Sequence, residues 1–222
     1  MTRGFFDPTF DELPDCLRVF PLAGALLLPG GRLPLNIFEP RYLSMVNDAL
    51  AVDRLIGMIQ PFERNDEGGA GAGGPQLYGI GCVGRMVSFS ETEDGRYLVT
   101  LAGLIRFDVG EELPLKEGFR RVRPLYERFR DDLEVDPRGI DRSRLLQALD
   151  EFLEVHGIKG DWEAIEETPD ERLVTSLAML CPFAPSEKQA LLEARTLPER
   201  AETMTTILQM AAHSEQREGA RH

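Results

Sequence analysis

Three glycines in the first half of the chain have the spacing best suited to binding a cofactor. Gly69, Gly71 and Gly74 satisfy the G-x-G-x-x-G pattern of dinucleotide-binding loops. That chemistry requires a strand directly before the glycines and a helix directly after them, because the helix N-terminus holds the pyrophosphate. Here the polar stretch ERNDE precedes the glycines and the strand-like PQLYGIG follows. The pattern therefore predicts a loop over 63–76, and no cofactor is expected.

Side chains that could act as nucleophiles or metal ligands do not form a recognisable set. Ser88 and Ser90 lie in MVSFSE, without the flanking glycines of a nucleophile elbow, and Lys116 and Lys159 lie in turn-like segments. No Walker A pattern is present. The histidines lack metal-ligand spacing, so no metal site is expected; they are His156, His213 and His222. The sequence predicts that the chain is not an enzyme.

The cysteines indicate the redox compartment of the protein, and the net charge indicates which classes of partner it can bind. Cys16, Cys82 and Cys181 are odd in number, far apart and set in apolar surroundings, which favours reduced core thiols in a cytoplasmic protein. The acidic N-terminus does not resemble a signal peptide, and no apolar run reaches the roughly 20 residues of a membrane span. A formal net charge of -13 would repel a phosphate backbone. We therefore expect neither nucleic acid nor membrane as a partner.

The FEPRY motif at 38–42 is the remaining candidate for a site. Glu39 and Arg41 lie in an apolar stretch, where each must reach solvent or find a partner, and Arg106 is one candidate partner for Glu39. One interpretation is a clamp that holds the start of a helix on a small β-barrel or sandwich. The other is a polar rim around an apolar binding surface. That surface would be formed by Phe38, Tyr42 and Met45.

The elements that would position these residues fall into two groups. Up to about residue 130 the chain alternates short apolar runs with turn residues, and EDGR at 93–96 is typical of a hairpin. Pro40 fits the first position of a helix whose apolar stripe is Leu43, Val46, Ala49 and Leu50. Strands are predicted at 16–20, 25–28, 32–38, 54–59, 78–89, 96–109 and 119–129.

Helical periodicity begins at about residue 136. It predicts a helix that ends at Gly157. Two further helices are expected to begin at capping boxes, one formed by Thr168 and Glu171 and the other by Thr196 and Glu199. The expected organisation is a β-domain at 1–130, a helical bundle at 136–212 and a frayed tail at 213–222. The expected fold class is therefore α+β.

An ordered set of motifs carries a family resemblance. FPLAGALLLPGGRLPLNIFEPRYLSMV, DRLIGMI, LYGIGCVGRM, YLVTLAGLIRF and PSEKQALLEARTLPERAETMTTIL resemble the N-terminal, substrate-binding domain of the Lon protease family, over about 17–208. The resemblance implies a PUA-like β pseudobarrel with one or more short helices, followed by a C-terminal helical bundle. It also implies a stand-alone member without the nucleotide-binding AAA+ and Ser-Lys peptidase domains of the full-length proteases.

The function expected from this resemblance is non-catalytic binding of unfolded or apolar polypeptide segments, and a role as an adaptor for a separate protease is one form that such binding could take. The candidate binding residues are Phe38, Glu39, Arg41, Tyr42, Met45 and Arg106. Two alternatives stay open. The chain could be a component of ATP-dependent proteolysis, or it could bind RNA as other PUA-like domains do.

Overall fold

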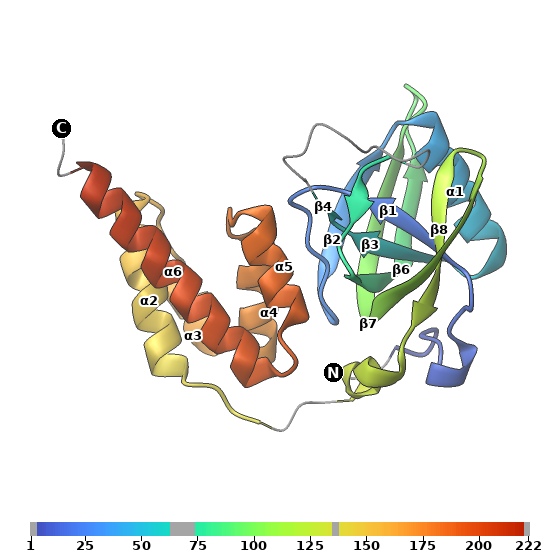
Figure 1. Cartoon of the computed structure of the whole chain (residues 1–222). Helices are drawn as coiled ribbons and strands as arrows, with labels where there is room; N and C mark the ends of the chain where they lie inside the picture. Colours follow the sequence, from blue (N-terminus) through green and yellow to red (C-terminus); the bar gives the residue numbers. More distant parts are fainter. Residues whose placement is uncertain (1–3, 63–73, 135–137, 220–222) are drawn as a thin grey trace. The chain divides into compact units, whose positions relative to one another are not determined.

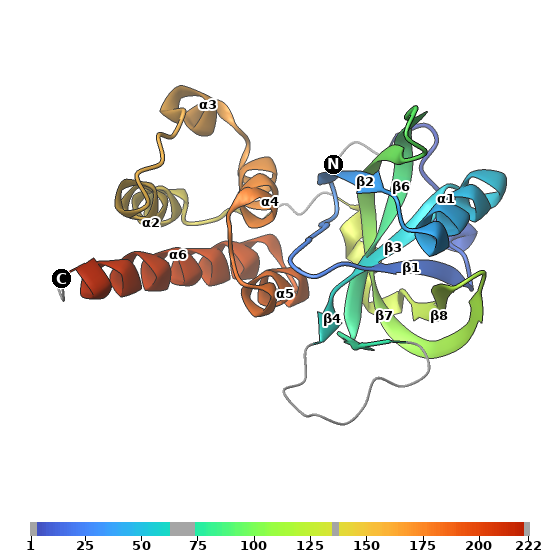
Figure 2. The ribbon, with the colours of Figure 1, turned by 90° about the horizontal axis from the view of Figure 1, so that it is seen from above.

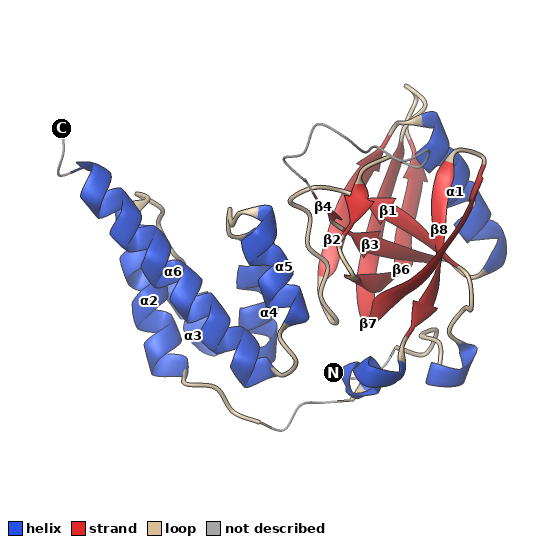
Figure 3. Ribbon diagram, viewed as in Figure 1, coloured by secondary structure: helices blue, strands red, loops and turns tan. Residues whose placement is uncertain are grey.

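A computed structural model describes residues 4–62, 74–134 and 138–219, with side chains described as far as residue 213 (Figure 1). The chain forms two compact units, Met1–Val135 and Asp136–His222. We propose that these units are the two domains expected at 1–130 and 136–212. Figure 3 shows that the described strands lie in the first unit and that the described part of the second unit contains helices. The α+β fold class is confirmed, whereas residues 63–73 of the expected loop lie outside the described residues.

The first unit is built on one sheet that closes on itself. Its strand order is β2-β7-β6-β3-β1-β8, and an additional pairing of β7 with β8 completes the barrel while β2 stays at an edge. Only β1 and β3 pair in parallel among the described strands. The strands of this sheet are β1 (Leu17–Pro21), β2 (Arg32–Ile37), β3 (Leu55–Ile59), β6 (Ile80–Glu91), β7 (Tyr97–Lys116) and β8 (Phe119–Leu125), and a separate ribbon pairs β4 (Pro61–Phe62) with β5 (Gln76–Leu77).

The segment 25–28 corrects one strand prediction. It is an irregular loop, and Leu26, Leu27 and Leu28 are buried in it. The loop is held on β7 at Gly103, whose N–H donates to the Gly31 carbonyl at 2.9 Å and whose carbonyl accepts from the Gly30 N–H at 2.9 Å. A Cβ at position 103 would lie 2.0 Å from the Leu28 carbonyl oxygen, so only glycine fits. The apolar run therefore fills the barrel core without pairing as a strand.

One helix and two turns complete the first unit. Helix α1 (Pro40–Val52) begins at the predicted proline and packs against β1, β3 and β8. The predicted 93–96 hairpin joins β6 to β7, with Gly95 at φ +82°. Strand β8 ends at Leu125, four residues before the predicted end, because the chain turns into the 3-10 helix η2 (Glu127–Leu133). A shorter 3-10 helix, η1 (Phe10–Glu12), precedes β1.

The second unit contains the expected helices and an additional short one, α3. Figures 1 and 2 both show α6 beside α2, the pair with the most extensive contact in this unit. Thr196 accepts the Glu199 N–H at 3.2 Å, as predicted, but Thr168 donates to the Ala164 carbonyl at 2.6 Å and closes α3 instead of starting α4. The helices are α2 (Arg142–Val155), α3 (Trp162–Glu167), α4 (Asp170–Leu180), α5 (Pro185–Glu193) and α6 (Leu197–Gly219).

Helix α6 reaches Gly219, so it includes most of the segment 213–222 for which a frayed tail was expected. None of the described helices has both the length and the apolar character needed to cross a membrane.

Candidate functional site

The FEPRY motif joins the edge strand β2 to helix α1. Glu39 has the extended backbone of a helix N-cap, but no side-chain cap bond forms. Its Oε2 instead accepts from Arg41, at 2.9 Å from Nε and 2.7 Å from Nη2. The Arg41 guanidinium carbon also lies 4.5 Å from the centre of the Tyr42 ring. The two charges of the motif therefore pair with each other, close to solvent.

Phe38 is exposed because it continues the outward face of β2. Along β2 the side chains alternate, and Arg32, Pro34 and Asn36 face solvent. Phe38 follows in the same phase and keeps 61% of its surface exposed. Since Asn36 pairs with Leu98 of β7, the same face also presents Leu98, which is 47% exposed.

These residues form a small apolar surface with a charged border. The Arg96 guanidinium carbon lies 5.8 Å from the centre of the Phe38 ring, and Arg96 pairs with Asp94 at 2.8 Å. Leu98 is the diagonal neighbour of Phe38 across the strand pair, a separation of about 7–8 Å in antiparallel sheets. We call this set the Phe38 surface; its members are Pro34, Phe38, Arg96 and Leu98.

Tyr42 and Met45 do not belong to this surface, which corrects the expected binding set. Tyr42 is 7% exposed and Met45 is fully buried, and the Tyr42 ring lies 4.3 Å from that of Phe20 on β1. Together with Val46 and Ala49 they form the buried face of α1. Burial also raises the pKa of Tyr42 above its ordinary value, with Arg41 acting in the opposite direction.

Arg106 is also separate from the motif, so its predicted pairing with Glu39 is wrong. Its side chain is buried in β7 and pairs with Asp132 of η2, at 2.9 Å from Nε and 2.7 Å from Nη2. The Arg106 backbone N–H donates to Asp132 as well, at 2.9 Å, and Phe129 lies beneath the guanidinium. Asp132 thereby anchors η2 to the barrel.

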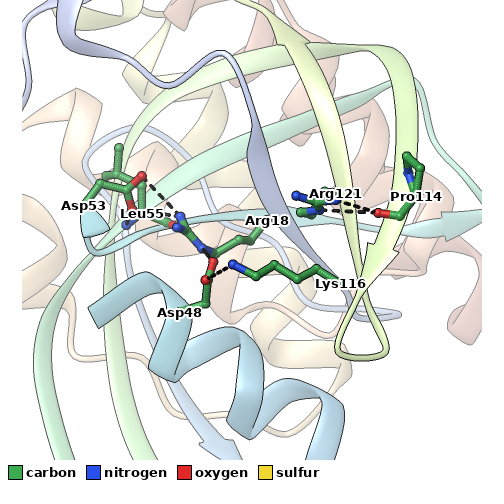
Figure 4. Close-up of polar contacts among 7 residues, drawn as sticks. All are labelled: Arg18, Asp48, Asp53, Leu55, Pro114, Lys116 and Arg121. Atoms are coloured by element: carbon green, nitrogen blue, oxygen red, sulfur yellow. Dashed lines mark hydrogen bonds and ion pairs between the residues drawn. The ribbon is translucent and has the colours of Figure 1, made fainter. Parts of the chain in front are cut away.

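A polar network that the sequence analysis did not identify holds α1 in place (Figure 4). Arg18 of β1 is 6% exposed; it donates to Asp48 of α1 and, at 2.9 Å, to Asp53 at the end of that helix. Lys116, at the end of β7, reaches the same Asp48 carboxylate. Burial by itself would raise the pKa of Asp48, but hydrogen bonds from Lys116 and Arg18 hold it below its ordinary value. The only sequence signal was a lone arginine in the apolar run CLRVF.

The described residues offer little for nucleophilic or metal chemistry. No group of three or more histidine, cysteine, aspartate or glutamate side chains is placed to hold a metal in the described parts of the chain. Cys82 and Cys181 are buried as expected, whereas Cys16 is exposed. Burial raises the pKa of Cys181 to about 11, so this sulfur is a thiol at neutral pH.

Comparisons with known proteins agree with the fold. Lon protease 2 of Myxococcus xanthus is 27% identical over 203 residues, which cover 89% of this chain and 24% of that protein. Lon protease of Anaeromyxobacter dehalogenans is 26% identical over 203 residues, covering 89% of this chain and 23% of that protein. The chain therefore matches less than a quarter of the length of these relatives.

Two solved structures share the fold. The Lon N-terminal domain protein from Xanthomonas campestris has a TM-score of 0.60 at 23% identity and covers 86% of this chain and 97% of its own. The N-terminal domain of Mycobacterium avium complex Lon protease has a TM-score of 0.61 at 14% identity, with 87% and 97% covered. The family model of the ATP-dependent protease La (LON) substrate-binding domain matches residues 16–210. The chain thus belongs to the LON substrate-binding domain family.

Proposed function

We propose that the chain is a non-catalytic module that binds exposed apolar segments of other polypeptides through the Phe38 surface. The observation that carries this proposal is the position of Phe38, an aromatic side chain held 61% exposed at the end of an edge strand. Exposed apolar clusters with a polar border are typical of interaction sites. A substrate-recognition role is also what the family description supports.

The edge strand favours an extended client that contacts the surface through side chains. In an antiparallel pair, every second residue hydrogen-bonds to the partner strand. The bond from the Gly103 N–H to the Gly31 carbonyl fixes this alternation along β2, so the backbone groups of Pro34 point away from β7 to the open edge. Proline has no N–H, so it loses no bond to β7 there, but it also cannot donate to an added strand. Apolar contact with Phe38 and Leu98 would therefore contribute more than a continuous backbone ladder.

A client could cover the Phe38 surface without burying an unpaired ion, because the charged side chains at its border are already paired. Glu39 and Arg41 already neutralise each other, as do Arg96 and Asp94. A client that covers Phe38 would leave these pairs exposed at the rim of the interface, where ion pairs change the free energy of binding little. The surface would thus accept apolar segments of varied sequence, as expected of an adaptor that presents clients to a separate protease.

The test is a binding measurement with fluorescein-labelled apolar peptides and with a reduced, carboxymethylated protein that stays unfolded. A single contact surface predicts a Kd of about 1 μM or weaker. Replacing Phe38 by Ser should weaken binding about tenfold to a hundredfold, because covering one phenylalanine contributes about 1.5–3 kcal/mol and each 1.4 kcal/mol is tenfold in Kd.

Val52 provides the matched control, since it is 69% exposed at the far end of α1. Its replacement by Ser removes a comparably exposed apolar side chain at the end of α1 away from the FEPRY motif and should leave the affinity unchanged. Equal affinities for the parent and the Phe38→Ser variant would exclude the Phe38 surface as the binding site.

A further inference from the structure

The N-terminal segment presents two adjacent aromatic side chains to solvent. Phe5 is 95% exposed and Phe6 is 78% exposed, and their rings meet edge to face with centres 5.1 Å apart. Burying one such ring is among the larger gains that an interface can make, and aromatic residues are enriched at binding hot spots. This pair lies outside the Phe38 surface and has no role in the function proposed above.

A set of bonds fixes the turn that carries the two rings. The Asp7 N–H donates to the Gly4 carbonyl at 3.0 Å, and the Gly4 N–H donates to the Asp7 carboxylate at 2.6 Å. Asp7 also pairs with Arg85 of β6 at 2.7 Å, with both side chains less than one-fifth exposed. The turn is therefore tied to the barrel, so a partner would bind it with little loss of conformational freedom.

The next residues anchor the segment a second time. Glu12 accepts bonds from the N–H and hydroxyl of Thr9, at 2.7 and 2.8 Å, which closes the capping box of η1. Phe10 packs with Tyr126, at 6.5 Å between ring centres, and lies under the Arg130 guanidinium at 3.8 Å. The turn is thus anchored at Asp7 and a second time through η1.

A pocket of about 470 Å³ lies beside the turn and combines aromatic and acidic walls. Asp53 in its wall pairs with Arg18, Asp7 pairs with Arg85, and the exposed Glu12 accepts bonds from Thr9. Its lining includes Phe5, Phe6, Thr9, Glu12, Asp53 and Leu55. Open aromatic faces next to carboxylates attract an ammonium or guanidinium group.

We propose that this N-terminal pocket binds a lysine or arginine side chain of a partner polypeptide, with neighbouring apolar residues of that segment packing on Phe5 and Phe6. The charge of the chain favours such a partner, because the formal net charge is -13 and exposed Asp11, Glu12 and Asp15 lie on the same segment. A second copy of the chain, with the same net charge, is a poorer occupant.

The experiment uses the whole chain and two fluorescein-labelled peptides of alternating apolar and charged residues, identical except for Lys in one and Glu in the other. The Phe5→Ser/Phe6→Ser double variant should lose about tenfold in affinity for the lysine peptide, combining a cation–π contact with lost apolar area, and keep its affinity for the glutamate peptide. Glu12→Gln, which retains an acceptor for Thr9, should also weaken lysine-peptide binding, and added salt should reduce the difference between the two peptides.

The outcomes separate this pocket from the Phe38 surface. Phe38→Ser should weaken both peptides to the same extent if the Phe38 surface binds clients, whereas the effect at Phe5 and Phe6 should depend on peptide charge. Parent affinity of the double variant for the lysine peptide would overturn the proposal, as would an equal loss for both peptides. A double variant that changes only the sedimentation of the chain would overturn it too, by identifying the pair as a self-association contact. Thermal melting should match the parent, because both rings are exposed.

Discussion

Two aromatic residues of the FEPRY motif, Phe38 before helix α1 and Tyr42 in its first turn, are predicted to respond oppositely to the same substitution. Tyr42→Ser removes a ring that is 7% exposed and lies 4.3 Å from the ring of Phe20, whereas Phe38→Ser removes a ring that is 61% exposed. The first variant should therefore lose stability and the second should lose client binding. Each variant serves as the control for the other.

The magnitude follows from burial. Removing a large aromatic side chain from a core costs about 3–5 kcal/mol, and Tyr42 belongs at the lower end because it lies in the first turn of α1. At about 2–4 °C per kcal/mol for a chain of this length, the melting temperature should fall by about 10 °C. For Phe38→Ser, a surface change of about 0.5 kcal/mol or less predicts a shift below about 2 °C.

Differential scanning calorimetry of the parent and both variants measures these shifts, and peptide anisotropy below the transition measures binding. Once folded, Tyr42→Ser should bind clients nearly as the parent does. The assignment of Tyr42 to the core would be refuted by a Tyr42→Ser melting temperature close to that of the parent. A loss as large for Phe38→Ser would refute its assignment to the surface.

Two further predictions concern the scaffold. Gly103→Ala should lower the melting temperature by several degrees or prevent folding, because the new methyl group meets the Leu28 carbonyl. Gly79→Ala is the control and should melt like the parent, since no heavy atom of the described residues, apart from its two chain neighbours, lies within 4 Å of its added Cβ. Calorimetry compares the two variants, and equal melting temperatures would contradict the docking of the loop on Gly103. The lowered pKa of Asp48 means that its bonds, including that from Lys116, stabilise the fold above the unfolded pKa and stop doing so as pH falls through the folded pKa. Asp48→Asn should therefore destabilise the chain at pH 7 and reduce the loss of stability below about pH 4. Urea titrations of the parent and the variant at several pH values measure this, and a parallel loss of stability in the two proteins on acidification would contradict the linkage.

Most strands of the barrel and helix α1 could be predicted because their signals are local, whereas the closure of the strands into a barrel was implied only by the family resemblance. Alternating apolar runs, the turn at 93–96 and Pro40 each specify their own element. The loop at 25–28 could not, because three consecutive leucines satisfy a strand pattern equally well and only the docking of the loop on Gly103 distinguishes the two. That contact joins residues far apart in sequence, beyond the reach of local patterns.

The candidate site was predictable in part for the same reason. The burial of Tyr42 and Met45 had a readable signal, since with Val46 and Ala49 they have the i, i+3, i+4, i+7 spacing of one helix face. The apolar stripe read from the sequence began one residue too late. The partner of Arg106 had no such signal, because Asp132 lies 26 residues away and approaches only when η2 folds back on β7.

Site-directed photo-crosslinking tests the central claim most directly. A photoreactive phenylalanine analogue replaces Phe38 or, as the control, Val52, and each protein is irradiated with a labelled, unfolded polypeptide in the presence and absence of unlabelled competitor. Both positions are exposed, at 61% and 69%, so accessibility alone predicts similar yields. The account predicts a competitor-sensitive crosslink from position 38 and only background from position 52. Equal yields from the two positions, or a specific crosslink from position 52 alone, would contradict it.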